Sequence, residues 1–158
     1  MHPEVLKKRI FFQAIVLVML SYPLQVLSQV SQSNKIQWSS QLIYQENAFQ
    51  ENVWSGHQIP GAPDALPPGG LHKNAFRLRS RADIGRFVVG FSRPQQSSHV
   101  IIVENFLPGR IAQVKLIDEQ GYGYVIYQSV ASVSPDNFRT FVLAFPRTLY
   151  KVKEIEVS

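Results

Sequence analysis

Residues 110–130 read RIAQVKLIDEQGYGYVIYQSV, two runs rich in Val, Ile, Leu and Tyr with a short polar segment between them. In the first run, the apolar residues Val114 and Leu116 alternate with the polar residues Gln113 and Lys115. A period of two places one set of side chains toward a core and the other toward water, as in a half-buried β-strand. The stretch therefore predicts two strands joined by a turn.

Similar runs recur on both sides of this stretch, at the spacing of roughly ten residues that is typical of β-sandwiches and barrels. Turn residues such as Pro108-Gly109 separate them. The expected strands are 75–80, 86–92, 99–105, 110–118, 123–130, 139–145 and 151–157. We therefore predict an all-β, jelly-roll sandwich.

Two details refine this prediction. Residues Val100–Val103 are four consecutive apolar residues, as in a strand that is covered on both faces, and the alternating Phe141, Leu143 and Phe145 form a second inward-facing set. The single helix that we expect is short and spans Ser55–Ile59, with Ser55 as its N-cap.

The segment 56–72 is dense in Pro and Gly, so we expect a long ordered loop at one end of the sandwich. Loops of this kind often carry function. The alternative is a simple crossover between the two sheets.

The N-terminus has the pattern of a secretory signal peptide, residues 1–28. A basic start, Lys7-Lys8-Arg9, precedes an apolar run to Leu20, and cleavage is expected after Ser28. An uncleaved membrane anchor or a buried core helix is the alternative. Residues 29–34 are then a flexible lead-in, and 35–158 form the sandwich domain.

Charge and cysteine content narrow the function classes. Without the predicted signal peptide the net charge of +5 falls to about +3, which together with export makes nucleic acid a poor partner. The chain has no cysteine, which excludes a disulfide scaffold and a lipid-modified lipoprotein. Export without disulfides favours a bacterial cell envelope, with the protein periplasmic or associated with the outer membrane.

The sequence contains none of the common catalytic or metal-binding motifs. His57, His72 and His99 lack metal-ligand spacing, so no metal and no cofactor are expected. Asp118 and Glu119 are adjacent, which directs them to opposite faces of a strand, at a turn where solvated charges are normal. We therefore predict a protein that is not an enzyme.

Five residues are candidate ligand-binding groups. Arg77 and Arg79 project from one face of the predicted strand as a two-guanidinium fork suited to carboxylate or phosphate. Trp54 and Tyr122 lie in predicted loops and could stack on a sugar ring, and Glu104 ends an apolar strand. The structural alternatives are a charged sheet edge for the arginines, core packing for the aromatic residues, and binding of backbone N–H groups of the following loop for Glu104.

The order of motifs resembles discoidin-like, galactose-binding-like β-sandwich domains. Residues 54–65, WSGHQIPGAPDA, are similar to the opening of such domains, and 88–94, 100–105 and 108–111 (VVGFSRP, VIIVEN and PGRI) are similar to their core. The resemblance covers roughly 38–157 and is shared with extracytoplasmic modules of Bacteroidetes envelope proteins of the OmpA family.

The resemblance implies a jelly roll with a non-catalytic binding or adhesion role. A glycan or an envelope protein is the implied partner, and the alternative is a structural spacer of an OmpA-like or secretion-associated protein. Trp54 replaces the family's Tyr and Phe76 its Trp, which changes the expected ligand contacts. Members continue past the strand at 151–157, so we expect this chain to lack the closing strand or strands, and to reach a membrane only through a partner or a missing C-terminal region.

Overall fold

A computed structural model describes residues 35–49, 53–65, 69–80 and 84–158 of the chain. The predicted signal peptide 1–28 and lead-in 29–34 lie outside these residues. All the strands belong to one compact unit, Gln37–Ser158.

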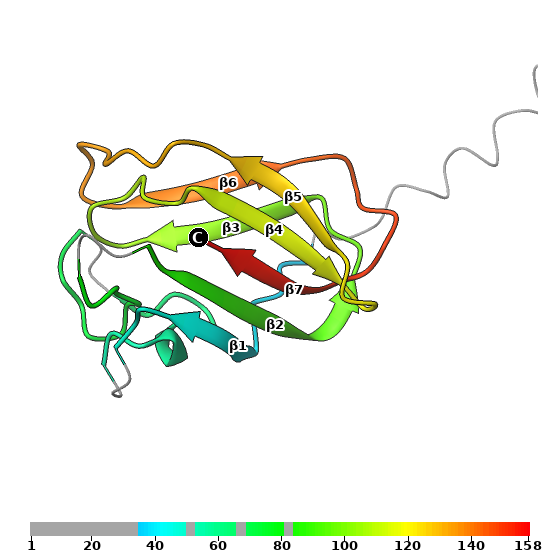
Figure 1. The fold of residues 1–158 in the computed structure, drawn as a ribbon, viewed down its shortest axis with the longest axis horizontal. Helices are drawn as coiled ribbons and strands as arrows, with labels where there is room; N and C mark the ends of the chain where they lie inside the picture. Colours follow the sequence, from blue (N-terminus) through cyan, green and yellow to red (C-terminus); the bar gives the residue numbers. More distant parts are fainter. Residues whose placement is uncertain (1–34, 50–52, 66–68, 81–83) are drawn as a thin grey trace, which may run out of the picture. The chain divides into compact units, whose positions relative to one another are not determined.

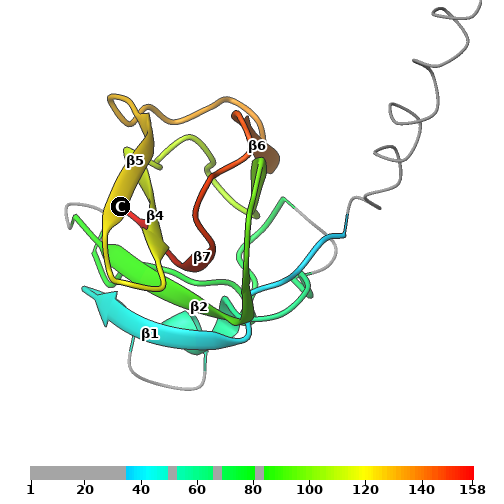
Figure 2. The same cartoon turned by 90° about the vertical axis from the view of Figure 1, so that its right-hand side faces the viewer.

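This unit is an all-β sandwich of two antiparallel sheets, as predicted (Figures 1 and 2). The larger sheet has the order β1-β2-β7-β4-β5 and the smaller one pairs β3 with β6. The strands are β1 (Gln41–Glu46), β2 (Arg86–Gln95), β3 (His99–Glu104), β4 (Gln113–Asp118), β5 (Gly123–Gln128), β6 (Arg139–Ala144) and β7 (Val152–Val157). The chain crosses between the sheets four times, which is the connectivity expected of a jelly-roll sandwich.

The core lies between the sheets and is centred on the alternating face of β4. Val114 and Leu116 are fully buried there, as the alternation predicts, against Ile155 and Val157 of β7. Burial of each such side chain contributes about 1.5–3 kcal/mol. On the other side, Phe141 and Leu143 of β6 and Phe145 directly after it pack against this core, so the predicted inward set is also confirmed.

The strand prediction is wrong at two places in the N-terminal half. β1 was missed because its sequence, QLIYQE, is polar at both ends and shows no long apolar run. The predicted strand 75–80 does not form; Leu78 makes a single isolated bridge with Ala48. The backbone N–H groups of this segment are instead used by neighbouring loops, with Arg77 donating to the Trp54 carbonyl oxygen at 2.9 Å.

β3 is not covered on both faces, contrary to the prediction from its apolar run. Val100 is 5% exposed, whereas Ile101 and Val103 are 37% and 39% exposed on the other face. The cause is the layer architecture, since in the described structure the smaller sheet has a second layer on only one side. The predicted helix at 55–59 is a single 3-10 turn, Gly56–Gln58, and Ser55 precedes it without a side-chain capping bond.

Candidate functional site

The long segment between β1 and β2 begins where β1 ends and returns where β2 begins, at the left-hand end of the sandwich in Figure 1. It is held by backbone contacts rather than by a sheet. Phe49 bridges Ser55, and the Trp54 N–H group donates to the Lys73 carbonyl oxygen at 2.9 Å. These contacts bring residues that are far apart in the segment to one place.

Trp54 adopts a left-handed backbone conformation, with φ of 58°. A bulky side chain adopts this conformation rarely, and it persists only where the surroundings hold it. Hydrogen bonds from Trp54 to Lys73 and from Arg77 to Trp54 fix the backbone on both sides. The indole Nε1 of Trp54 and the hydroxyl of Ser55 are buried with no hydrogen-bond partner in the described structure.

Arg77 lies against two aromatic rings. Its guanidinium carbon is 5.5 Å from the centroid of the Trp54 ring and 6.0 Å from that of Phe49, and the two rings are themselves 5.6 Å apart. We call Phe49, Trp54 and Arg77 the arginine–aromatic cluster. Contacts of this geometry stabilise by about 0.5–1 kcal/mol at exposed positions and hold the guanidinium in one orientation.

The sequence predicted the members of this cluster only in part. The sequence indicates Trp54 and Arg77, but it gives no signal for Phe49, which lies just after β1. The Arg79 side chain is exposed, and the backbone N–H group of Arg79 donates to the Asn47 carbonyl oxygen at 2.9 Å. Because 75–80 is not a strand, the alternation that placed Arg77 and Arg79 on one face does not apply.

Glu104 lies at the same end of the sandwich but is engaged within the protein. One carboxylate oxygen accepts a hydrogen bond from the Gly109 N–H group at 2.8 Å, and the other accepts one from Nε of Arg139 at 2.7 Å. The structural interpretation of Glu104, in which the loop that follows β3 donates to it, is confirmed. Next to it, Asn105 binds the backbone of Gly69 and Gly70 and so ties the Pro/Gly segment to β3.

Tyr122 lies in the β4–β5 hairpin, at the end of the sandwich opposite the cluster (Figure 1). Its side chain is 68% exposed, and its N–H group donates to Asp118 Oδ1 at 2.9 Å. The structure therefore brings Trp54 and Arg77 together, places Arg79 and Glu104 at the same end, and separates Tyr122 from all four.

Asp118 corrects the expectation of a solvated turn charge, because it is only 3% exposed. Its carboxylate accepts hydrogen bonds from the N–H groups of Gln120 and Tyr122 and from the Tyr124 hydroxyl at 3.1 Å. An Asp immediately before a Gly-containing turn is the sequence signal for this arrangement. The hydrogen bond to Asp118 raises the pKa of Tyr124, and burial followed by the charge of Asp118 raises the pKa of Tyr150, which stacks on Tyr124.

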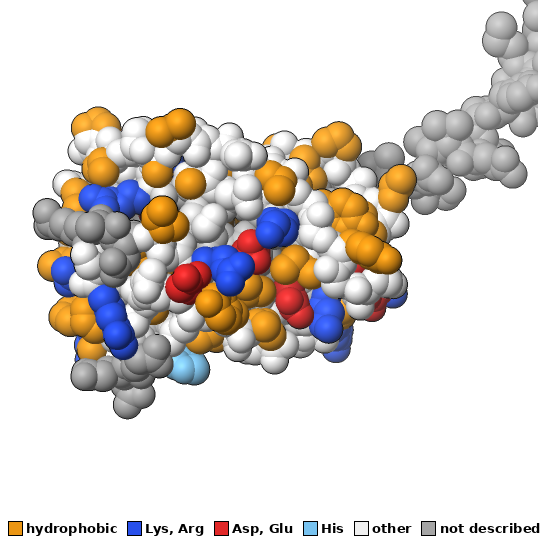
Figure 3. Space-filling view, in the orientation of Figure 1, with side chains coloured by type: hydrophobic (Ala, Val, Ile, Leu, Met, Phe, Trp, Pro, Cys, Tyr) orange, Lys and Arg blue, Asp and Glu red, His pale blue; other side chains and the backbone are white. Residues whose placement is uncertain are grey.

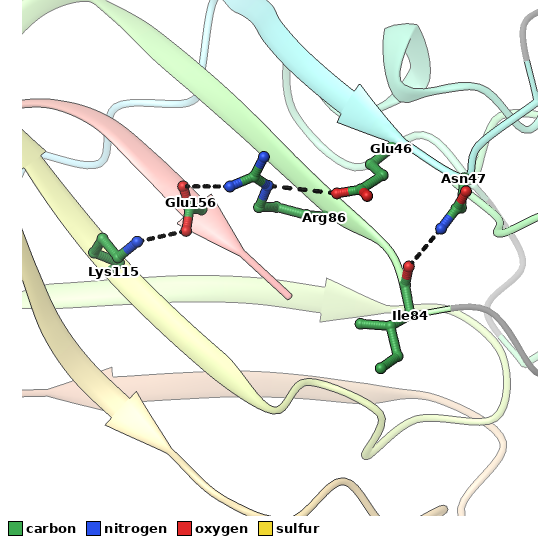
Figure 4. A network of polar contacts seen from close by, with 6 residues as sticks. All are labelled: Glu46, Asn47, Ile84, Arg86, Lys115 and Glu156. Carbon is green, nitrogen blue, oxygen red and sulfur yellow. Dashed lines mark hydrogen bonds and ion pairs between the residues drawn. The ribbon is translucent and has the colours of Figure 1, made fainter.

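The outer face of the larger sheet carries a row of alternating charges (Figures 3 and 4). Glu156 of β7 lies between Lys115, at 2.6 Å, and Arg86, at 3.7 Å, and Arg86 also approaches Glu46 at 3.7 Å. Arg86 lies over the Tyr44 ring. A side-chain hydrogen bond with Tyr44 and the charge of Glu156 raise the pKa of its guanidinium. Each charge in this row has an opposite charge beside it. The row is therefore explained as the paired surface of the sheet, and no ligand is needed to account for it.

No protein-family model matches this chain, and a search of curated proteins finds no match to it. Within residues 35–49, 53–65, 69–80 and 84–158, no helix has the length and apolar character needed to cross a membrane. In the same residues, no group of three or more His, Asp or Glu side chains is placed to hold a metal ion.

Proposed function

We propose that this protein is an exported, non-catalytic binding module of the bacterial cell envelope that recognises a glycan through the loops at one end of its sandwich. The arginine–aromatic cluster is the observation that carries this proposal. It joins two ring systems and a planar cation in loops outside the sheets, and sandwiches of this class use such end loops for binding.

The backbone of the cluster supports a binding role. A strained residue costs about 1–3 kcal/mol unless its surroundings compensate, and such residues concentrate at functional sites. Trp54 is strained in this way, in a segment held by hydrogen bonds to Lys73 and Arg77. The predicted signal peptide and the resemblance to galactose-binding-like domains support the exported location and the ligand class.

A structural spacer without a ligand is the second candidate. It is favoured by the engagement of the other polar groups, because Glu104, Asn105 and Asp118 all use their side chains to hold loops of the protein itself. A spacer would need these contacts and would have no use for the arginine–aromatic cluster.

A binding screen with glycans and peptidoglycan fragments distinguishes the two candidates. The parent protein is expected to bind at least one carbohydrate, and Trp54→Ala and Arg77→Ala are expected to weaken that binding about tenfold or more. Tyr122→Ala is the matched control, since it removes an exposed aromatic ring at the opposite end of the sandwich.

Circular dichroism shows whether each variant remains folded. If no carbohydrate binds, or if folded Trp54→Ala and Arg77→Ala bind as the parent does, this function is wrong. Loss of binding in Tyr122→Ala alone would move the site to the β4–β5 hairpin.

A further inference from the structure

Arginines contact aromatic rings at three places in the described part of the chain. Arg139 lies over Phe141 at 4.4 Å, Arg86 over Tyr44 at 4.7 Å, and Arg77 over Trp54 at 5.5 Å. The three contacts share one type of interaction, so the charges around them can be compared directly.

Carboxylates neutralise two of these three arginines. Arg139 pairs with Glu104 at 2.5 Å, and Arg86 lies 3.7 Å from both Glu46 and Glu156. For Arg77, no carboxylate among the described residues lies within ion-pair distance. Arg77 is thus the stacked arginine whose charge the described structure leaves without a counter-charge.

The neighbours of Arg77 add positive charge. Lys73 and Arg79 are exposed, and the backbone of Lys73 is bonded to that of Trp54. Asp64, the described carboxylate on the nearby loop, accepts a hydrogen bond from Asn74 at 3.0 Å. The cluster therefore presents a cation on an aromatic surface within a basic segment.

From this we infer that the ligand of the arginine–aromatic cluster is an acidic sugar, whose ring carboxylate binds the guanidinium of Arg77. This inference rests on the proposed function and specifies its ligand. A guanidinium that lies on ring faces keeps its in-plane N–H donors available, and these match the two oxygens of a carboxylate. The rings also restrict the side chain, so less conformational entropy is lost when the ligand binds.

The test uses polygalacturonate, alginate and hyaluronate as carboxylate polymers, with fully methyl-esterified polygalacturonate and dextran as neutral ones. Isothermal titration calorimetry on the purified protein measures each affinity at low and at physiological salt. We expect at least one carboxylate polymer to bind about tenfold or more tightly than the neutral polymers. The free energy of a hydrogen bond to a charged group corresponds to an affinity ratio of this size. Raising the salt concentration should weaken that binding.

Two substitutions locate the effect. Arg77→Ala should reduce carboxylate binding to the level of the neutral polymers, and Arg77→Lys should restore it only in part, because Lys keeps the charge but lacks the planar pair of donors. Lys151→Ala removes the same charge just before β7, where the Lys151 side chain is 61% exposed and its Nζ lies 3.9 Å from Glu119, and should leave binding unchanged.

The outcomes separate this inference from the proposed function. If neutral polymers bind as tightly as acidic ones, or if Arg77→Lys binds as the parent does, the acidic-sugar inference is overturned and the glycan-binding function stands. If Lys151→Ala weakens binding as much as Arg77→Ala, the attraction is nonspecific and the inference is overturned. If no polymer binds, the inference is overturned, and the wider screen described above decides the function.

Discussion

Two arginines at the same end of the sandwich, Arg139 and Arg77, have opposite surroundings. Arg139 lies on a strand, contacts Phe141 and is paired with Glu104, which also holds the loop at Gly109. Arg77 lies on a loop, contacts Trp54 and Phe49, and has no carboxylate partner among the described residues. The difference shows that a stacked arginine can be a structural element or an available binding group, and that its counter-charge distinguishes the two.

The largest effect is expected from Gly109→Ala, which disrupts the loop held by Glu104. Gly109 has φ of 95°, and a Cβ atom there would collide with the backbone oxygen of Ser132. Strain and overpacking together should lower the free energy of unfolding by about 3 kcal/mol, measured by urea denaturation. Gly121→Ala is the control, because Gly121 has φ of 89° with open space around its Cβ position, and it should cost about 1 kcal/mol. Equal losses in the two variants would contradict the predicted collision at Gly109.

A smaller effect should separate the two arginines themselves. Arg139→Ala leaves the carboxylate of Glu104, whose side chain is 13% exposed, without its cation, and should cost about 2 kcal/mol of unfolding free energy. Arg77→Ala removes only ring contacts and should cost less than about 1 kcal/mol. Urea denaturation monitored by tryptophan fluorescence measures both.

The reverse order of these two losses would mean that Arg77, and not Arg139, is the structural residue. The variant Arg139→Lys tests whether charge alone is sufficient beside Glu104. A Lys at this position keeps the charge beside Glu104 but lacks the two guanidinium nitrogens, Nε and Nη2, that both contact Oε2 of Glu104, so the stability of this variant should lie between those of the parent and of Arg139→Ala.

The smallest effect concerns the opposite end, where neutral donors rather than a guanidinium satisfy Asp118. The raised pKa of Tyr124 means that folding favours its neutral hydroxyl, the donor to Asp118. Because the folded pKa exceeds the unfolded value of about 10, this contribution to stability is complete below pH 10 and is lost as the pH rises above it. A pH titration of tyrosinate absorbance should show one tyrosine that ionises above the usual pH range, and Tyr124→Phe should remove that part of the absorbance change. An ordinary pKa for Tyr124 in the parent would contradict this hydrogen bond.

The C-terminal half of the domain follows its sequence pattern more closely than the N-terminal half. Strands β4 to β7 were predicted to within a few residues, because their side chains alternate or form apolar runs between clear turn signals. The segment 75–80 has a similar composition but forms no strand. The backbone N–H groups of Arg77 and Arg79 donate instead to the carbonyl oxygens of Trp54 and Asn47, which lie outside the strands. The local sequence pattern does not predict which segment will pair with the backbone of another.

The candidate site shows the same division. Residue type alone selected Trp54 and Arg77, since aromatic rings and guanidinium groups near loops are common binding groups. It could not include Phe49, which contacts Trp54 only after the chain has folded back, and it gave no sign that Tyr122 lies at the other end of the sandwich. The sequence offered the contact of Glu104 with the loop that follows it, and Gly109 makes that contact, but it gave no sign of Arg139, which follows Glu104 by 35 positions.

The amino-acid pattern is enough to predict an all-β sandwich with a core on the alternating face of β4, because the periodicity of buried side chains is a local property of the chain. Which stacked arginine has a carboxylate beside it follows instead from the three-dimensional arrangement of the chain. That outcome depends on the pairing of β3 with β6, which sets Glu104 opposite Arg139, and on a loop that brings Arg77 to two aromatic rings and to no carboxylate among the described residues. Two opposite charges neutralise each other only when the fold places them close together, and their positions along the chain do not predict that distance.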